Sequence, residues 1–245
     1  MKTTIIAEIG LNHNGNMEMA KCLIDEAHRA GADIAKFQFF DISEYFGPEF
    51  EWYEECMKAR IDYDKAEMLR DYCDKVGIEF MSSVFNLQGV EWAEKLGMKR
   101  YKIASRCIGQ QDLFDAVGET GKDMIVSLGM WHMIGDVTNP TAPLPTHINS
   151  KGKVDFLYCV AKYPTMPEDI DFDKIDFKDK YSGFSDHTIG MNAPLIAVAR
   201  GARIIEKHFT LSKKMHGPDH QGSMEPNELR QLVKSAREFE EFMSK

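Results

Sequence analysis

The stretch GFSDHTIGMNAPLIAVARGARIIEKHFTL, residues 183–211, contains one complete strand–helix–strand repeat. Its helical segment ends at Gly201, where a left-handed cap is expected, and an apolar strand-like run follows at once. His187 and His208 are 208 − 187 = 21 residues apart, which is about the length of one such repeat. The two histidines are therefore expected at the ends of neighbouring strands, not on one helix.

The same unit recurs along the chain. Helical segments also end at Gly31, Gly77, Gly97 and Gly121, each followed by an apolar run of the kind typical of parallel strands buried on both faces. Together with further apolar runs, the predicted strands lie near residues 4–9, 34–39, 79–83, 100–105, 124–128, 154–159, 182–186 and 203–208. This pattern predicts an α/β fold, a (β/α)8 TIM barrel that forms a single domain over residues 1–245. A doubly wound open sheet is the alternative, but no glycine-rich phosphate loop of familiar spacing supports it.

Two connections differ from the repeat. Residues 40–64 are long, aromatic and acidic, and we expect them to cover the barrel mouth. Residues 131–153 contain Pro140, Pro143 and Pro145, which interrupt any regular fifth helix. The chain ends on a predicted helix that Pro226 opens.

Composition restricts the class of protein. A net charge of −9 argues against a nucleic-acid or membrane-surface binder, although a locally positive pocket could still take an anionic substrate. The five scattered cysteines form no C-x-x-C pair, which favours reduced thiols. Neither a signal-peptide pattern nor a membrane-spanning run is visible, so we expect a soluble, cytoplasmic protein.

Polar side chains gather at the carboxyl ends of the predicted strands, where a TIM barrel carries its active site. Alternation places Lys36 with Gln38, Ser185 with His187, and Glu206 with His208 on shared faces. Lys102 stands between apolar residues and needs an anionic partner if it is buried. Following strand order, the candidates at strand ends are Glu8, Asn12, His13, Lys36, Gln38, Ser82, Ser83, Lys102, Ser105, Ser127, Tyr163, Ser185, His187, Glu206 and His208.

The histidine pair predicts a metal site. Adjacent parallel strands lie about 5 Å apart, so two imidazoles could converge on one divalent ion beside Glu206. Nitrogen and oxygen donors together suit Mn²⁺, Fe²⁺, Co²⁺ or Zn²⁺ more than Ca²⁺. The alternative is that one histidine only hydrogen-bonds a backbone carbonyl. Beyond the last strand, Asp219 is a candidate for contact with substrate hydroxyls, whereas His216 and His220 could equally be exposed loop residues.

The motifs AEIGLNHNG, KFQ, YKIAS, SLGM, YPT, GFSDHT, EKHFT and GPDH…SMEP occur in this order between about residues 5 and 230. In this combination the chain resembles the sialic acid synthase (N-acetylneuraminate synthase) family, which includes pseudaminic and legionaminic acid synthases and spore-coat polysaccharide synthases. The resemblance implies a TIM barrel that condenses phosphoenolpyruvate with an aldose, N-acetylmannosamine or a divergent sugar. The products would be a 2-keto-3-deoxy sugar acid and phosphate.

The resemblance also implies roles for single residues. Glu8, Lys36, Lys102 and Glu206 would be catalytic, and His187 and His208 would hold a divalent metal, Mn²⁺ first, with Mg²⁺ or Co²⁺ as alternatives. The residues around phosphoenolpyruvate would be Lys36, Ser83, Lys102, Ser105, Ser127 and Ser185. Those facing the sugar would be Glu8, Gln38, Tyr163 and Asp219, and Glu206 would lie between the metal and phosphoenolpyruvate. The substrate-binding set is Gln38, Ser83, Ser105, Ser127, Tyr163, Ser185 and Asp219.

Several positions depart from the family pattern. Arg106 and Cys107 stand where the family has glycine and an acidic residue, and Ala161 and Lys162 stand where it offers Asn or Ser. The family's antifreeze-like C-terminal domain, which lends an arginine to the partner subunit, is not expected here, so a homodimer would need another interface. These changes predict an altered acceptor, with Arg106 as a replacement for that arginine or a ligand for an anionic sugar group.

Two alternatives stay open at this point. One is a related metal-dependent aldolase or 3-deoxy-octulosonate-type synthase. The other is a catalytically inactive barrel that serves as a binding subunit. Retention of Lys36, Lys102, His187, Glu206 and His208 favours the synthase over both.

Overall fold

The eight predicted strands all form, and they close into a parallel barrel. In the computed structural model, which describes residues 2–243, β1 pairs with both β2 and β10, so the sheet has no free edge. The open-sheet alternative is therefore wrong. The strands are β1 Thr4–Gly10, β2 Ile34–Phe39, β3 Glu79–Val84, β4 Arg100–Ile103, β5 Asp123–Ser127, β8 Val154–Cys159, β9 Gly183–Asp186 and β10 Ile204–His208.

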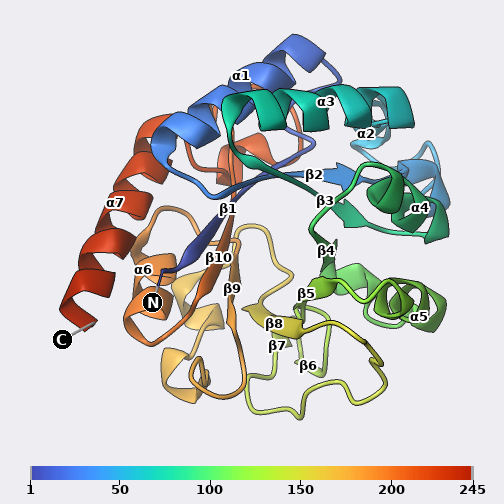
Figure 1. Ribbon diagram of the computed structural model, residues 1–245. Coiled ribbons are helices and arrows are strands. Elements are labelled where there is room, and N and C mark those ends of the chain that lie inside the picture. Colours follow the sequence, from blue (N-terminus) through green and yellow to red (C-terminus); the bar gives the residue numbers. More distant parts are fainter. Residues whose placement is uncertain (1, 244–245) are drawn as a thin grey trace.

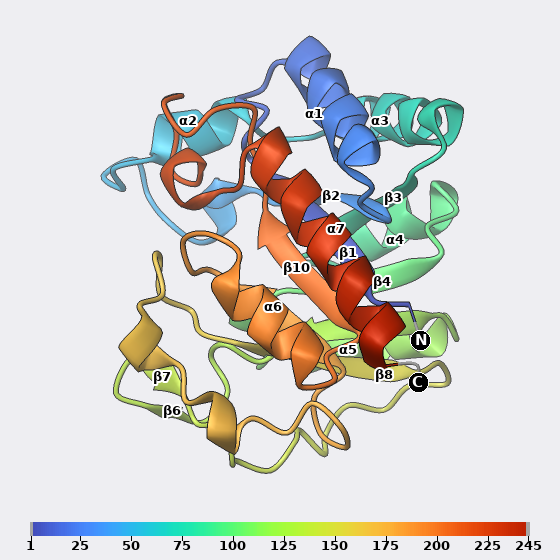
Figure 2. The ribbon, with the colours of Figure 1, turned by 90° about the vertical axis from the view of Figure 1, so that its left-hand side faces the viewer.

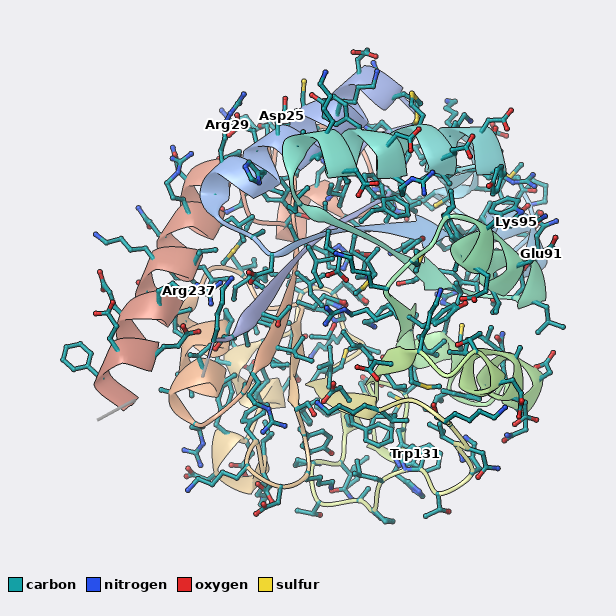
Figure 3. The ribbon with its side chains drawn as sticks, in the orientation of Figure 1. Asp25, Arg29, Glu91, Lys95, Trp131 and Arg237 are labelled. Atoms are coloured by element: carbon teal, nitrogen blue, oxygen red, sulfur yellow. The ribbon has the colours of Figure 1, made fainter. Side chains whose placement is uncertain are left out.

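Helices cover most of this barrel, but in the described residues the connections after β5 and after β8 contain no α-helix, so loops cover that side (Figure 1). Figure 2 shows α7 running along the outside of the barrel, in contact with both α1 and α6. On α7, Arg237 binds Asp33 just before β2 at 2.9 Å, which ties the C-terminal helix to the strands (Figure 3). The helices are α1 Met17–Ala30, α2 Tyr53–Lys58, α3 Tyr63–Val76, α4 Leu87–Lys95, α5 Gln111–Glu119, α6 Asn192–Ala199 and α7 Pro226–Met243.

Local chemistry explains where these helices start and stop. The side chain of Asn16 accepts hydrogen bonds from the backbone N–H groups of Glu18 and Met19 at the start of α1. Gly31 ends the same helix at φ 88°, a left-handed conformation that glycine adopts without a steric penalty. The left-handed caps predicted at the other four glycines are confirmed as well.

The two unusual connections behave as predicted. Residues 40–64 form a 3-10 turn, Ile42–Glu44, and the short α2, and several of their side chains line the cavity at the barrel mouth. Between β5 and β8, the described residues 128–153 contain no α-helix, only a small hairpin of β6 Met133–Ile134 and β7 Val137–Thr138. Trp131 anchors this connection by donating from its indole to the carbonyl of Pro143 at 2.8 Å (Figure 3).

The remaining short elements lie in the loops that connect strands and helices. They are 3-10 turns at Ser105–Cys107, Pro167–Asp169, Phe172–Lys174 and His220–Gly222. All five cysteines are free thiols, as the sequence predicted. Within residues 2–243, the helices are too short or too polar for any of them to cross a membrane.

Candidate active site at the barrel mouth

A cavity of about 320 Å³ opens at the carboxyl ends of the strands, and its volume is in the range of small-molecule sites. Side chains that were predicted to form one site come from strands far apart in sequence, and they converge at this cavity. Every residue of the predicted site lines it: Glu8, Lys36, Gln38, Ser83, Lys102, Ser105, Ser127, Tyr163, Ser185, His187, Glu206, His208 and Asp219.

Lys36 lies at the floor of this cavity and is almost completely buried. Its ammonium lies 2.7 Å from Glu8 Oε2 and 3.5 Å from Glu206 Oε2, and it donates to Ser83 Oγ at 3.0 Å. Burial alone would lower the pKa of Lys36, but Glu206 and Glu8 outweigh burial and raise it. Lys36 is therefore a charged group held in place by two carboxylates.

Lys102 is equally buried, but carboxylates balance its charge less well than that of Lys36. It donates to Ser127 Oγ at 2.7 Å, and Glu206 Oε1 lies farther away, at 3.7 Å. Burial lowers the pKa of Lys102, and the attraction of Glu206 does not reverse this. An added anion beside Lys102 would stabilise its charged form.

Glu206 links the two lysines. Burial would raise the pKa of Glu206, but Lys102 and Lys36 lower it to about 2, and Ser185 donates to its Oε1 at 2.9 Å. Its Oε2 and the Oε2 of Glu8 are buried without a well-directed hydrogen bond. Both oxygens lie near the Lys36 ammonium, at 2.7 Å for Glu8 and 3.5 Å for Glu206, but native proteins seldom leave such atoms without a hydrogen bond. These carboxylates are therefore arranged to accept a hydrogen bond from a ligand or water.

Gly10 shows why the first strand ends as it does. Glu8 accepts a hydrogen bond from Gln38 Nε2 at 2.6 Å, directly beside Gly10, whose φ is 52°. A Cβ at position 10 would lie 3.1 Å from Glu8 Oε1 and 3.3 Å from Gln38 Nε2. Glycine therefore leaves room for this pair and supplies the left-handed turn.

The two histidines lie side by side, with ring centroids 5.5 Å apart. His187 Nδ1 lies 2.7 Å from the carbonyl oxygen of Val160, which places the proton on Nδ1 and leaves the Nε2 lone pair available. Burial, with His208 nearby, lowers the pKa of His187 to about 3, so its ring is neutral at physiological pH. His208 Nδ1 is buried without a hydrogen-bond partner and lies 3.6 Å from Asp219 Oδ2.

These observations fit a divalent metal on the histidine pair. Neutral imidazoles bind such ions, and a buried ring nitrogen without a hydrogen-bond partner has a lone pair available for the metal. Nevertheless, no group of three or more His, Cys, Asp or Glu side chains among residues 2–243 is arranged to hold a metal by itself. An ion at this pair would therefore need water or substrate oxygens as further ligands.

Tyr163 covers the histidine pair. Its ring centroid lies 4.0 Å from that of His187 and 5.9 Å from that of His208. The residue is 63% exposed, so its ring forms the boundary between the two histidines and solvent. A substrate bound at the histidines would touch this ring.

The positions that depart from the family pattern have different surroundings. Arg106 and Ala161 line the cavity. Cys107 is buried and belongs to the hydrophobic core. Lys162 does not line the cavity, because its ammonium binds Asp169 at 2.9 Å.

Some strand-end candidates lie outside the cavity. Asn12 donates to the carbonyl of Phe209 and to Ser223 Oγ, both at 2.9 Å, so it connects two loops. His13 is completely buried and packs against Phe37. Ser82 is also buried but does not line the cavity.

The two loop histidines behave differently from each other. His216 is exposed, as one of the two alternatives for this residue predicted, and it contacts Glu55 at 3.1 Å. For His220 the exposed alternative is wrong, because the residue is fully buried and bonds Thr210 Oγ1 at 2.7 Å. Its bond to Asn14, at 3.2 Å, adds a contact between the first and last loops that no local pattern indicates.

The sequence did not indicate several apolar residues that line the cavity. Cys159 could have been found, because it ends β8 on the face that points inward. Met130 and the rings of Phe46 and Phe50 lie in irregular loops, where no periodicity indicates direction.

Comparison with known proteins gives a consistent result. Residues 23–245 match the profile of the NeuB family. The uncharacterized protein MJ1065 of Methanocaldococcus jannaschii is 37% identical, over 98% of this chain and 72% of its own. The N,N'-diacetyllegionaminic acid synthase of Campylobacter jejuni is 33% identical, over 99% of this chain and 78% of its own. The crystal structure of the N-acetylneuraminic acid synthetase of Leptospira borgpetersenii superposes with a TM-score of 0.88 at 30% identity, covering 100% of this chain and 86% of the other.

Proposed function

This chain belongs to the NeuB family of sialic acid-type synthases, which form carbon–carbon bonds, and we propose that it condenses phosphoenolpyruvate with an aldose. The products are a 2-keto-3-deoxy sugar acid and inorganic phosphate. The observation that carries this proposal is the buried group of Glu8, Lys36, Lys102 and Glu206, whose side chains meet at the cavity floor. Among residues 2–243, Oε2 of Glu8 and Oε2 of Glu206 accept no well-directed hydrogen bond, although both lie near the Lys36 ammonium. In the same proposal, the barrel is a single synthase domain.

Lys36 and Lys102 bind phosphoenolpyruvate in this proposal. Its phosphate and carboxylate are strong acceptors, and charge-assisted hydrogen bonds from ammonium groups are the strong ones. The nearby hydroxyls of Ser83, Ser105, Ser127 and Ser185 can rotate to donate to the same oxygens. Glu206 holds both ammonium groups in position from one side.

His187 and His208 hold the divalent metal, for which we propose Mn²⁺, with Mg²⁺ or Co²⁺ as alternatives. When bound, such an ion supplies Lewis acidity that polarises the aldehyde oxygen of the open-chain aldose. The carbonyl of Val160 keeps His187 in the tautomer that presents Nε2.

In the reaction, C3 of phosphoenolpyruvate bonds to the aldehyde carbon, whose oxygen becomes a hydroxyl. Water adds at C2, and the C2–O bond to phosphate breaks, which leaves the keto group. Glu8, which Lys36 and Gln38 hold in place, takes one proton from this water and passes it to the aldehyde oxygen, and the second proton of the water leaves with the phosphate. Gln38, Tyr163 and Asp219 face the sugar and bind its hydroxyls.

Turnover with a panel of aldoses tests the proposal. The purified protein is incubated with phosphoenolpyruvate, Mn²⁺ and each aldose, and phosphate release is measured together with 2-keto-3-deoxy acid formation. We expect the two products in equal amounts. No turnover with any aldose, and no thermal shift on adding phosphoenolpyruvate, would refute the proposed function.

A histidine variant tests the metal assignment. We expect His208→Ala to lose metal-dependent turnover, because one of two imidazole donors is removed. His216→Ala is the matched control, since His216 is exposed and does not line the cavity. Full metal-dependent activity in His208→Ala would overturn the assignment.

A further inference from the structure

Arg106 occupies a distinctive place at the cavity. It follows β4 in the turn Ser105–Cys107, is exposed, and lines the same cavity as Lys36 and Lys102. The centre of its guanidinium lies 5.5 Å from the ring centroid of Phe40, 5.2 Å from that of Tyr45 and 5.5 Å from that of Phe46. Cation–π contacts of this length stabilise a guanidinium in one position.

The hydrogen-bonding groups of Arg106 are nevertheless free. Among residues 2–243, no carboxylate lies within 4.0 Å of its guanidinium and no acceptor forms a hydrogen bond with it. By contrast, Arg100 binds Glu79 at 2.9 Å and Arg237 binds Asp33 at 2.9 Å. Contacts with aromatic faces use the charge of a guanidinium but none of its five N–H donors. Arg106 therefore offers an unneutralised, pre-positioned cation at the cavity, in a chain whose net charge is −9.

Barrel topology sets where Arg106 stands relative to the histidines. In the closed order β1-β10-β9-β8-β5-β4-β3-β2, β4 is four strands from β10 in either direction. Arg106, just beyond β4, therefore lies across the barrel mouth from His208 at the end of β10. A sugar whose aldehyde carbon lies at the histidine pair would extend its other end towards Arg106.

We propose that Arg106 binds an oxyanion at the end of the acceptor sugar distant from its aldehyde, so that the preferred acceptor is an anionic aldose. This inference rests on the proposed function, because the aldehyde end is placed by the histidine pair. Lys36 and Lys102 already have Glu8 and Glu206 as partners, whereas within the described residues 2–243 no carboxylate neutralises Arg106. The planar guanidinium fork matches both a phosphate ester and a carboxylate.

Matched acceptors distinguish the two oxyanions. The wild-type protein is assayed with N-acetylmannosamine, with its 6-phosphate, and with the corresponding uronic acid. We expect one anionic sugar to exceed the neutral sugar in kcat/KM. A higher value for the 6-phosphate identifies a phosphate site, and a higher value for the uronic acid identifies a carboxylate site. Equal or lower values for both anionic sugars would overturn the inference.

Variants test whether Arg106 is responsible. We expect Arg106→Gln to lower kcat/KM for the anionic sugar about 10- to 100-fold, while KM for phosphoenolpyruvate and turnover of the neutral sugar stay unchanged. Arg106→Lys keeps the charge but loses the fork, so its loss should be intermediate. Arg230→Gln is the matched control, because Arg230 is exposed on the distant helix α7. If Arg106→Gln loosens the packing of Phe40, Tyr45 and Phe46 and lowers Tm, the acceptor preference of Arg106→Lys is compared with that of the wild type instead.

Failure of this inference can be separated from failure of the proposed function. Turnover in which Arg106→Gln leaves the anionic-to-neutral ratio unchanged overturns only the inference. If no aldose is turned over, calorimetric titration with the 6-phosphate decides: weaker binding by Arg106→Gln supports the inference, and equal binding refutes it. A change in oligomeric state on sedimentation, with unchanged acceptor preference, would instead assign Arg106 to a contact between subunits and refute the inference.

Discussion

Glu206 and Lys207 are neighbours on β10, yet they belong to two buried ionic groups. The groups differ in whether all their polar atoms find hydrogen-bond partners within the protein. Strand alternation turns Glu206 towards the barrel interior and Lys207 towards the outer wall. We call the first the inner group, which comprises Glu8, Lys36, Lys102 and Glu206. We call the second the outer group, which comprises Asp186, Thr188 and Lys207.

The charged groups of the outer group find their hydrogen-bond partners within the group. Lys207 Nζ binds Asp186 Oδ2 at 2.6 Å and also donates to the carbonyl of Thr188. Asp186 Oδ1 accepts from the backbone N–H of Thr188 at 2.8 Å, and Oδ2 accepts from its hydroxyl at 3.1 Å. Every polar atom of this pair therefore has a partner within the protein.

The inner group is incomplete. Oε2 of Glu8 and of Glu206 lack well-directed hydrogen bonds, and the group opens into a cavity of about 320 Å³. Burying charge is costly unless it is paired, so an incomplete buried group is retained only if something else completes it. Buried charge alone therefore does not identify a site, whereas buried charge that lacks hydrogen bonds and faces a cavity does.

Removing the lysine of the outer group should have the largest effect, and that effect should be on stability. Lys207→Met leaves Asp186 as an unpaired buried carboxylate, which costs about 3–5 kcal/mol of unfolding free energy. Urea unfolding measures this loss, and folded molecules should keep their KM for phosphoenolpyruvate. Lys95→Met, at an exposed pair with Glu91 on α4, is the control and should change stability little (Figure 3). A double change of Asp186→Asn with Lys207→Met should recover part of the loss; a stable single variant would contradict the assignment.

Removing a lysine of the inner group should affect activity instead. We expect Lys102→Met to lower kcat/KM about 10²- to 10³-fold, the size typical of one lost electrostatic contact to a transition state. The loss of unfolding free energy should be smaller than for Lys207→Met, because Lys36 still lies beside Glu206 and because burial lowers the pKa of Lys102, so that its charge is itself costly to bury. Steady-state kinetics and urea unfolding of the same preparation check both parts. A variant that keeps most of its activity but unfolds easily would show that the inner group is structural.

The pH dependence of phosphoenolpyruvate binding should report Lys102. Its pKa is lowered from 10.5, so in the free site its charge is lost at a lower pH than in an ordinary lysine. Above that pH, binding an anion must first restore the proton, and Kd should rise up to about tenfold per pH unit. The raised pKa of Lys36 gives no such change in this range. Calorimetry in buffers of different ionisation enthalpy should detect proton uptake on binding; binding without proton uptake at alkaline pH would contradict the prediction.

The smallest expected effect comes from a hydroxyl that supports Glu206. Ser185→Ala removes the 2.9 Å hydrogen bond to Glu206 Oε1. We expect the activation free energy to rise by about 1 kcal/mol, which corresponds to roughly a fivefold loss in kcat/KM. Ser82→Ala is a matched control, because Ser82 is also buried in a strand but does not line the cavity. Equal effects of the two changes would mean that burial, not the contact with Glu206, matters.

Much of the fold could be predicted because its signals are local. A glycine cap depends on the φ of one residue, and a buried strand depends on a run of apolar side chains, so all eight strands and all five caps were recognised. The strand residues of the candidate site followed from the same signals, because alternation along a strand decides which side chains point inward. Ser105, Tyr163 and Asp219 lie beyond the strands, where alternation gives no direction. Residues in irregular loops, such as His220 and Met130, carry no such periodicity.

The sequence by itself therefore determined the barrel and most of the polar side chains that meet at its mouth. Only the tertiary structure decided how these groups are completed: which carboxylate oxygens lack a hydrogen bond, which nitrogen of His187 faces the cavity, and that Arg106 lies among three rings with no carboxylate of residues 2–243 beside it. The physical reason is distance along the chain. Periodicity and capping act over a few residues, whereas a hydrogen bond or ion pair between strands depends on where closure of the barrel brings groups that are far apart in sequence.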